Sequence, residues 1–387
     1  MKTKKVAVLD IGSDAITLVM QDKYTDSYTF RAVQEYDGFY NGEFFDPQGL
    51  FKVVSNLISE CEKSTFTKVK QILVGVPGEF SAVVTSKVQN DLGINRKVME
   101  LDVDALYDLG KPDSDDHVCI SASPIYFELD DGTCTITPVG ATTKKLKCLM
   151  SYVVAEKSFT ALFDQIAEEL GLSFTYASGV QAEVMYVVPE QLRDEGVILA
   201  DVGYTTTSVA YAIGDGVAHM LSFSLGAGHI AADISEIKEI PYAHALALVD
   251  RINLNVDASD EDEYAVSVGQ EIAYYKIKEI NEIASARIEN IADMIGKAIR
   301  NSYYDVSLNT KVLLTGSGIS QIPGAREIVA RLTSRQVEIL APDILQFNKP
   351  KFSQVAGLLV VQQRQLMQKH RTNKFISSIK EIISRRK

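Results

Sequence analysis

One pattern occurs twice in the chain and restricts its possible folds more than any other feature. It consists of a short apolar run, an aspartate, an apolar residue, a glycine, a turn and a second apolar run. The first copy covers Val6–Asp10 and Ile16–Met20, and the second covers Val197–Asp201 and Ser208–Ala212. Short apolar runs bounded by turn residues are typical of buried strands. The repeat predicts an internal duplication in which each half carries one sheet and the two glycine turns face each other across a cleft.

The segments around these hairpins indicate an α/β protein with more than one lobe. A chain of 387 residues is too long for one ordinary core. Alternating strand patterns with Gly and Pro turns predict a small inserted α+β unit at about Pro77–Val154. Helical patterns are expected near Gly49–Cys61, Ser158–Leu170, Ala231–Ile252 and roughly Gly269–Tyr303.

Composition excludes several classes of protein. The net charge of −12 argues against general nucleic-acid binding, which requires a basic surface. The four cysteines form no C-x-x-C pair and the five histidines form no H-E-x-x-H motif, so a disulfide framework or a zinc site is not expected. The first residues, MKTKKVAVLD, pass directly into a strand, and no apolar run reaches the length of about 18 residues that spans a bilayer. We therefore expect a chain that is neither exported nor membrane-spanning.

The two hairpins carry the residues expected of a phosphate-binding site. Glycine tolerates positive φ and lets a ligand approach the backbone, so a glycine turn can aim N–H groups at phosphate oxygens. An aspartate that ends the preceding strand is placed to hold Mg²⁺ through water molecules. The pattern predicts that Asp10 and Asp201 bind Mg²⁺ and that a third glycine loop passes close to a nucleoside. The predicted phosphate and nucleoside contacts are Gly12, Ser13, Gly203, Thr205, Thr206, Gly316, Ser317 and Gly318.

These motifs resemble a known superfamily. DIGSDAITLVM, ADVGYTTTSVAYA and LLTGSGISQIPGA are similar to the two phosphate loops and the adenosine loop of the actin, chaperone and sugar-kinase ATPases. Within that superfamily the chain resembles the FtsA family, the actin-like proteins of bacterial cell division, along almost its whole length. The resemblance implies two actin-like α/β lobes around a cleft, with ATP and Mg²⁺ as ligands.

Further segments match features of the FtsA family. ILVGVPGEFSAVVTSKVQ and CISASPIYFELDDGTCTITPVGATTKKLKCLMSYVVA resemble its inserted subdomain, which argues against MreB and actin itself. LGAGHIAADIS resembles the segment after the second phosphate hairpin, which adds Gly226 and Gly228 to the implied nucleotide contacts. The implied division is 1–76 and 155–196 for the first lobe, 77–154 for the insert, 197–228 and 302–356 for the second lobe, 229–301 for its helical subdomain, 357–372 for the last helix and linker, and 373–387 for a terminal helix.

The chain also departs from the family. The lysine usual in the first phosphate loop is Ala15, and the Gly-Gly usual in the second loop is Tyr204-Thr205. A later aspartate of that hairpin is Ser208, and the family's Glu and Lys beside the base and ribose align with His244 and Ala247. A tyrosine crowds a loop that works through bare backbone, and a lost lysine removes a charge facing the phosphates. We expect ATP binding with at most slow hydrolysis, in a nucleotide-binding or degenerate structural protein.

Two residues before the second hairpin are candidates to position a water molecule. Gln181 resembles actin's glutamine at this place, and Glu183 is the other candidate. An amide can orient water by hydrogen bonds without being a strong base, which fits slow hydrolysis. The alternative is a polar helix residue that bonds only to solvent or backbone.

The last 15 residues predict an amphipathic helix that binds a membrane surface. Asn373 can cap this helix, and its apolar residues recur at intervals that place them on one stripe. A helix of that length, about 22 Å, is too short and too charged to span a bilayer. The alternative is a final helix packed on the domain, but the composition and the resemblance to the family's membrane-targeting helix favour an anionic membrane surface. The predicted membrane-binding residues are Phe375, Ile376, Ile379, Ile382, Ile383, Lys380, Arg385 and Arg386.

The resemblance implies a filament-forming adaptor of cell division. It would tether the tubulin-like protein FtsZ to the cytoplasmic face of the bacterial cell membrane at the division septum, with the FtsZ C-terminal peptide bound by the subdomain at roughly His229–Arg300. One alternative is a PilM-like scaffold of a type IV pilus or secretion machine, which shares the inserted unit. Another is a small-molecule kinase, for which the sequence offers no general base. The terminal helix favours the adaptor over the pilus scaffold, which docks on membrane-embedded partners.

Overall fold

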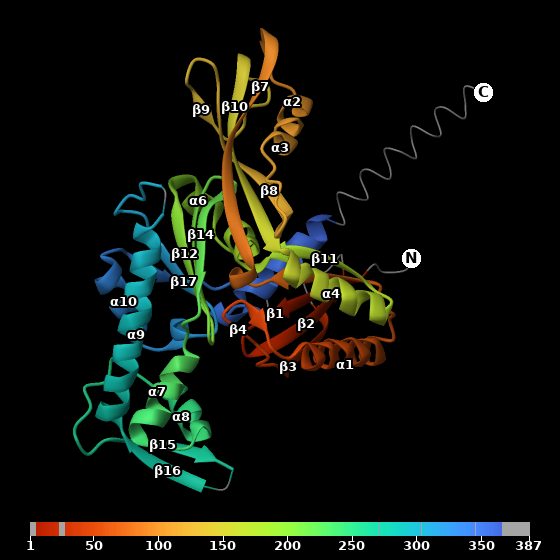
Figure 1. Ribbon diagram of the computed structural model, residues 1–387. Helices are drawn as coiled ribbons and strands as arrows, with labels where there is room; N and C mark the ends of the chain where they lie inside the picture. Colours follow the sequence, from red (N-terminus) through yellow and green to blue (C-terminus); the bar gives the residue numbers. More distant parts are fainter. Residues whose placement is uncertain (1–4, 23–27, 270, 303, 345, 366–387) are drawn as a thin grey trace.

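The chain forms two α/β lobes, a projecting inserted sheet and a helical subdomain (Figure 1). The computed structural model describes residues 5–22, 28–269, 271–302, 304–344 and 346–365. The inserted sheet extends away from both lobes at one end of the molecule, and the helical subdomain lies at the opposite end. Among the described residues, no helix is both long and apolar enough to cross a bilayer.

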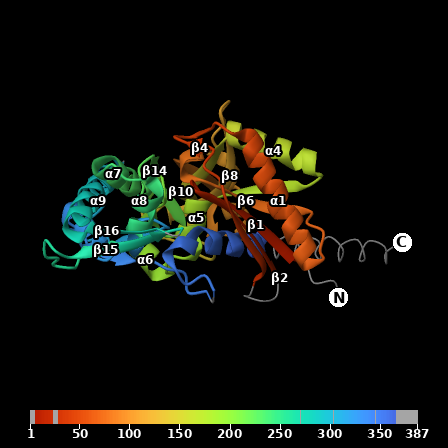
Figure 2. The same ribbon diagram turned by 90° about the horizontal axis from the view of Figure 1, so that it is seen from below.

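The first lobe is built on a five-stranded sheet of order β11-β6-β1-β2-β3. Alternate residues of β1 enter different cores. Ala7 and Leu9 contact the core formed with α1 and α4, while Val8 packs against the helix at 353–365 on the other face (Figure 2). The helix α1 begins where the Asp46 carboxylate accepts from the N–H of Gly49 at 2.9 Å. The elements are β1 Lys5–Ile11, β2 Ala15–Asp22, β3 Tyr28–Glu35, β4 Phe39–Tyr40, β5 Glu43–Phe44, α1 Pro47–Thr65, β6 Gln71–Val76, α4 Lys157–Leu170 and β11 Ser173–Ser178.

The second lobe repeats this arrangement. Its five-stranded sheet has the order β14-β13-β12-β17-β18, so the hairpin β12–β13 and the parallel strand β17 correspond to β1–β2 and β6. One face packs on α7, α9 and α10, and the other packs on α5 and α6. The expected duplication is therefore seen in the strand topology. The elements are α5 Gly179–Tyr186, α6 Glu190–Glu195, β12 Val197–Val202, β13 Thr207–Ile213, β14 Gly216–Phe223, β17 Val312–Thr315, α10 Ala325–Thr333 and β18 Val337–Ile339.

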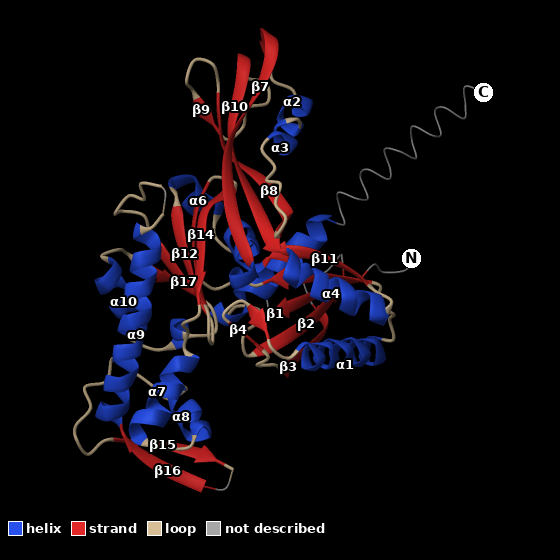
Figure 3. Ribbon diagram, viewed as in Figure 1, coloured by secondary structure: helices blue, strands red, loops and turns tan. Residues whose placement is uncertain are grey.

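An inserted α+β unit follows the break at Pro77, between β6 and α4 (Figure 3). Its four-stranded sheet has the order β7-β10-β8-β9, and three long strands form most of it. A separate apolar core containing Phe127, Leu146 and Tyr152 holds the two short helices on this sheet. The elements are β7 Ser81–Lys97, α2 Glu100–Asp104, α3 Leu106–Leu109, β8 His117–Glu128, β9 Cys134–Thr135 and β10 Thr142–Glu156.

The helical subdomain differs from the sequence expectation in two places. The helix expected at roughly Gly269–Tyr303 begins only at Ile277, because the preceding residues form the second strand of a hairpin whose turn contains Gly269 at φ +63°. The helix expected over Ala231–Ile252 is divided, since Pro241 cannot continue a helix from the preceding turn. The elements are α7 Gly228–Lys238, α8 Tyr242–Val249, β15 Glu263–Val268, β16 Glu271–Lys276 and α9 Ile277–Arg300.

The predicted membrane-binding helix lies outside the described residues. Its stripe runs from Phe375 to Ile383, beyond the last described residue, Gln365. The structure therefore neither supports nor opposes the membrane anchor, which stays a prediction.

Candidate functional site

The two phosphate loops meet directly at the cleft between the lobes. The backbone N–H of Thr205 in the second loop donates to the Ser13 hydroxyl oxygen of the first loop at 3.0 Å. Both loops close in the same way, because the N–H of Gly12 donates to the carbonyl of Ala15 at 2.9 Å and the N–H of Gly203 donates to that of Thr206 at 2.8 Å. The glycine turns therefore face each other, as the repeated motif predicts.

The other glycine segments pack on the second phosphate loop. The N–H of Gly318 donates to the carbonyl of Val202 at 2.8 Å, and that of Gly228 donates to the carbonyl of Tyr204 at 2.6 Å. A Cβ atom at Gly226 would lie 2.5 Å from the Tyr204 carbonyl oxygen, and one at Gly316, where φ is +94°, would overlap the carboxylate of Asp201. These glycines are required for close contact between loops, whatever ligand the cleft binds.

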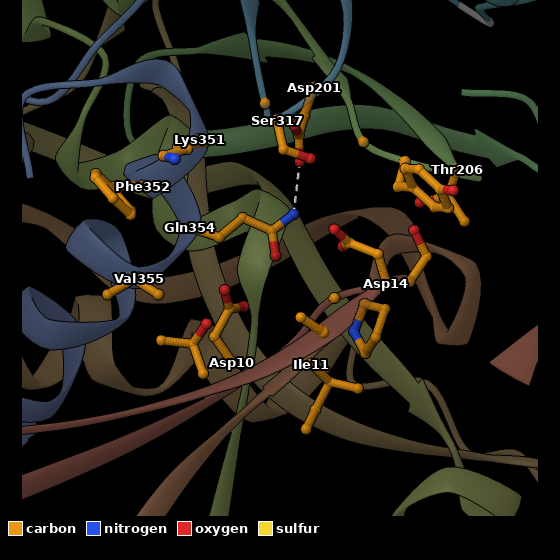
Figure 4. A pocket seen from close by; sticks show the side chains of 18 of the residues that line it. Asp10, Ile11, Asp14, Asp201, Thr206, Ser317, Lys351, Phe352, Gln354 and Val355 are labelled. Atoms are coloured by element: carbon orange, nitrogen blue, oxygen red, sulfur yellow. Dashed lines mark hydrogen bonds between the residues drawn. The ribbon is translucent and has the colours of Figure 1, made fainter. Parts of the chain in front are cut away.

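A cavity of about 240 Å³ lies between the two hairpins (Figure 4). Among the described residues, its lining lacks Thr205, Gly226, Gly228, Gly318 and Gln181. The predicted residues that do line it are Asp10, Gly12, Ser13, Glu183, Asp201, Gly203, Thr206, Gly316 and Ser317.

Four carboxyl groups line this cavity: Glu183 and Asp201 are buried, Asp10 is half-buried and Asp14 is exposed. Burial and the charge of Asp201 raise the pKa of Asp10 from 3.8 to about 7, and burial raises the pKa of Asp201 to about 6. Burial, followed by the charges of Asp201 and Asp10, raises the pKa of Glu183 well above its ordinary value. Such shifts arise because a carboxylate loses hydration and faces like charges. The cavity therefore favours a compensating cation or proton.

The carboxyl groups fit a hydrated cation better than a directly coordinated one. Neither carboxylate oxygen of Glu183 has a hydrogen-bond partner in the part of the chain that the structure describes, although the side chain is fully buried. No group of three His, Cys, Asp or Glu side chains among the described residues is close enough to hold a metal directly. Mg²⁺ keeps much of its hydration shell, so contacts through water molecules suit this arrangement.

The two candidates for water positioning have different surroundings. The Gln181 amide donates to the hydroxyl of Ser121 in the inserted unit at 3.0 Å, and its helix α5 is capped by the hydroxyl of Ser178. Glu183 instead lines the cavity together with the two aspartates. Of the two, only Glu183 is close to the predicted metal site.

The first turn of the last described helix and the segment just before it contribute residues that the sequence analysis did not identify. Gln354 donates from its amide to the Asp201 carboxylate at 2.6 Å, as the dashed line in Figure 4 shows. Lys351 and Phe352 line the same side of the cavity, and Arg31 of β3 stacks over the Phe352 ring at 4.3 Å. No local motif identifies these residues, because only the tertiary return of the chain brings them to the phosphate loops.

The side of the cleft assigned to the nucleoside is arranged differently from the family pattern. The imidazole of His244 lies 2.8 Å from the Tyr275 hydroxyl, measured from its Nδ1 atom. The ring of Tyr204 lies against Gly228, and its hydroxyl pairs with that of Tyr242. The residues that line the cavity therefore fit phosphate groups and a hydrated Mg²⁺, and the ring of Tyr204 lies between the second phosphate loop and the helices α7 and α8.

The fold and the paired glycine hairpins define an actin-like protein. The structure is similar to that of the PilM–PilN type IV pilus biogenesis complex, with a TM-score of 0.62 and 13% identity over 92% of this chain and 98% of the other. It is also similar to MreB 5 of Spiroplasma citri bound to AMPPNP, with a TM-score of 0.57 and 11% identity over 97% and 100% of the two chains. These similarities confirm the actin-like fold. In the MreB 5 structure, a protein of this fold has AMPPNP bound.

Sequence comparisons find similarity to one family of actin-like proteins. The family model described as cell division protein FtsA matches residues 198–357. Cell division protein FtsA of Buchnera aphidicola subsp. Baizongia pistaciae is 18% identical over 85% of this chain and 80% of its own length. That of Neisseria meningitidis serogroup B is 21% identical over 92% and 89%. The chain is thus similar to FtsA proteins over most of its length, which confirms the resemblance that its motifs indicate.

Proposed function

We propose that this protein is an FtsA-like adaptor of bacterial cell division, which forms actin-like filaments and tethers FtsZ to the cytoplasmic membrane. One observation carries the proposal: similarity to proteins named FtsA extends over 85% and 92% of the chain, including the inserted unit. Heterologous contacts between protomers generate open filaments when they do not close into a ring. The site of action is the cytoplasmic face of the cell membrane at the division septum.

The cleft would hold the phosphates of ATP with a hydrated Mg²⁺. Gly12, Ser13, Gly203 and Thr206 present the hairpin turns to the cavity, and Asp10 with its two carboxylate neighbours would hold the ion. Bound Mg²⁺ supplies positive charge that the first loop lacks at Ala15. The chain's own residues position the ligand, but the cavity places no lysine in the first loop to face the phosphates. We expect phosphate release far below the rate of about 1 s⁻¹ at the low end of ordinary enzymes.

The helical subdomain at 229–301 would receive the C-terminal peptide of FtsZ. This assignment rests on the resemblance to FtsA, and the exposed apolar side chains of the subdomain support it. Tyr274 on β16 is 63% exposed and Leu246 on α8 is 43% exposed. Apolar anchors on a strand or helix surface are typical of peptide-binding sites.

The membrane contact would be made by residues 373–387. The stripe around Ile379 would enter the headgroup region while Lys380, Arg385 and Arg386 contact anionic lipids. One copy would bind modestly, and a filament that displays many copies would bind firmly by avidity. Filament formation and membrane residence would thus be coupled.

The second candidate function is a PilM-like scaffold of a pilus or secretion machine. The similarity of the fold to the PilM–PilN complex favours it, whereas the sequence relatives favour the division adaptor.

A pull-down with the FtsZ of the same bacterium, intact and without its C-terminal tail, separates the two functions. The adaptor function requires binding of intact FtsZ that is lost with the tail. If the protein does not bind intact FtsZ but binds the cytoplasmic peptide of a pilus membrane protein, the scaffold function is correct.

A further inference from the structure

The side chain of Tyr204 bridges the second phosphate loop and the helical subdomain. Its ring carbons would lie 2.9 Å from a Cβ atom at Gly228, so the ring packs on the bare backbone at the start of α7. Its hydroxyl pairs with the hydroxyl of Tyr242, the first residue of α8. A single side chain therefore connects the β12–β13 turn of the second lobe with two helices of the subdomain.

The cavity between the hairpins reaches Tyr204 but not the two helices that Tyr204 contacts. Tyr204 is part of the cavity lining, whereas the described residues of α7 and α8 do not contribute to it. The backbone around the ring is also engaged, because the N–H groups of Ala227 and Gly228 donate to the carbonyls of Gly203 and Tyr204. Phosphate-loop residues thus line an open cavity, while a tyrosine ring and paired backbone groups occupy the adjoining side.

We propose that Tyr204, held by Tyr242, is a specificity-determining residue that excludes the nucleoside, so that the closed cleft accepts a chain of phosphates with Mg²⁺ but not a whole nucleotide. This inference rests on the proposed phosphate site. A nucleotide binds only when the ring leaves Gly228, which breaks the contact with Tyr242 and releases the phosphate loop from α8. Because binding and this contact exclude each other, the apparent affinity for ATP equals the intrinsic affinity multiplied by the fraction of molecules whose ring is displaced.

The same geometry links the cleft to the subdomain. Since Tyr242 opens α8, displacement of the Tyr204 ring frees the first turn of that helix. The subdomain therefore differs between the phosphate-bound and nucleotide-bound protein, which gives a readout that does not depend on hydrolysis. A second contact of α8, between His244 and the hydroxyl of Tyr275 on β16, does not involve Tyr204.

Calorimetric titration of the full chain with two ligands tests the inference. Inorganic tripolyphosphate carries the three phosphates of ATP without the nucleoside, and both ligands are used with Mg²⁺. We expect the wild type to bind tripolyphosphate about tenfold or more tightly than ATP. Tyr204→Gly should tighten ATP binding by about tenfold while changing tripolyphosphate binding less than about threefold.

Two further variants separate ring volume from the hydroxyl contact. Tyr242→Phe removes one hydroxyl and leaves the ring of Tyr204 in place, so ATP binding should tighten by only a few-fold, about 2 to 5 times, as expected for one hydrogen bond. Tyr40→Phe, which changes an exposed tyrosine of the first lobe that does not line the cavity, is the matched control and should change neither affinity. If Tyr204→Gly does not fold, hydrogen exchange of the wild type decides, because ATP but not tripolyphosphate should increase exchange in α8.

Equal affinity of the wild type for ATP and tripolyphosphate overturns the inference and leaves the phosphate site intact. Failure of both ligands to bind to wild type and Tyr204→Gly overturns the inference and also removes the nucleotide site from the proposed function. Membrane and FtsZ binding are measured independently of either result.

Discussion

The N–H of Thr205 donates to the hydroxyl oxygen of Ser13 across 3.0 Å, so the two phosphate loops of this actin-like protein are joined without an intermediary. The two residues belong to different lobes and to the two copies of the duplicated hairpin. A hydrogen bond within the protein therefore holds the two phosphate loops together, in addition to any bond that a ligand makes.

Ser13→Ala should weaken this junction. A typical intramolecular hydrogen bond contributes about 0.5–1.5 kcal/mol, and the variant leaves the N–H of Thr205 without its acceptor, so we expect a loss of about 1 kcal/mol in the free energy of unfolding. Urea denaturation followed by circular dichroism measures it. Ser267→Ala, at an exposed position of β15, is the control and should leave the midpoint unchanged. An equal effect in both variants would show that the junction contributes nothing.

Gln354→Ala should destabilise the second lobe and shift the titration of Asp201. The amide donates to the carboxylate at 2.6 Å and lowers its pKa, which burial otherwise raises. Hydrogen bonds to charged groups contribute about 1.5–3 kcal/mol to stability. For this half-buried pair we expect the free energy of unfolding to fall by an amount near the lower end of that range. Gln336→Ala, at an exposed position, controls for the loss of an amide. Thermal unfolding at about pH 8, where Asp201 is ionised, should separate the two variants.

Stability should fall as pH rises toward neutrality. Burial and the charge of Asp201 raise the folded-state pKa of Asp10 from 3.8 to about 7. The folded protein therefore binds more protons than the unfolded chain between these values, so the free energy of unfolding decreases until the pH exceeds about 7. Asp10→Asn should flatten this decrease between about pH 5 and pH 8 in melts without divalent cations.

The control for this pH dependence is Asp343→Asn, which changes an exposed carboxyl group. The slope of its free energy of unfolding against pH should equal that of the wild type. Mg²⁺ should raise the wild-type melting temperature more at about pH 8 than at about pH 5, because protons compete with the ion for the carboxylates. A Mg²⁺ effect that is independent of pH would argue against an ion at Asp10.

Replacing both Ile379 and Ile382 by aspartate should abolish sedimentation with anionic vesicles. The change puts charge at the centre of the apolar stripe, whereas Ser377→Asp with Ser378→Asp adds the same charge outside it. The serine variant should bind the vesicles more weakly than the wild type only because its added charges are repelled by the anionic lipids. Raising the salt concentration should weaken vesicle binding by the wild type. Unfolding of the isoleucine variant, or its unchanged sedimentation, would identify the helix as a structural element.

The sequence predicted the hairpins well, because their signal is local. The run Val197–Asp201 and its partner strand carry apolar periodicity and a glycine turn within a few residues, and the structure pairs them as expected. The sequence predicts a helix over roughly 269–303, which includes residues 271–276, yet the turn at Gly269 pairs these residues with β15 as a strand.

Contacts between distant segments were not predictable in this way. The crowding by Tyr204 was evident from a glycine-rich motif, but its partner Tyr242 was not. Gln354 likewise follows no motif that relates it to Asp201. Such pairs depend on how the lobes and loops fold back on one another, and a single sequence does not contain that information in any local pattern.

Recruitment of FtsZ polymers to anionic vesicles tests the proposed adaptor function most directly. Fluorescent FtsZ is mixed with GTP, vesicles and this protein, and the vesicle-bound fraction is measured by flotation. We predict that FtsZ floats with the vesicles only when the protein is present, and that removing the FtsZ C-terminal tail or introducing aspartate at Ile379 and Ile382 abolishes it. FtsZ that stays in solution although the protein itself floats, or that floats equally without its tail, would contradict the proposed function.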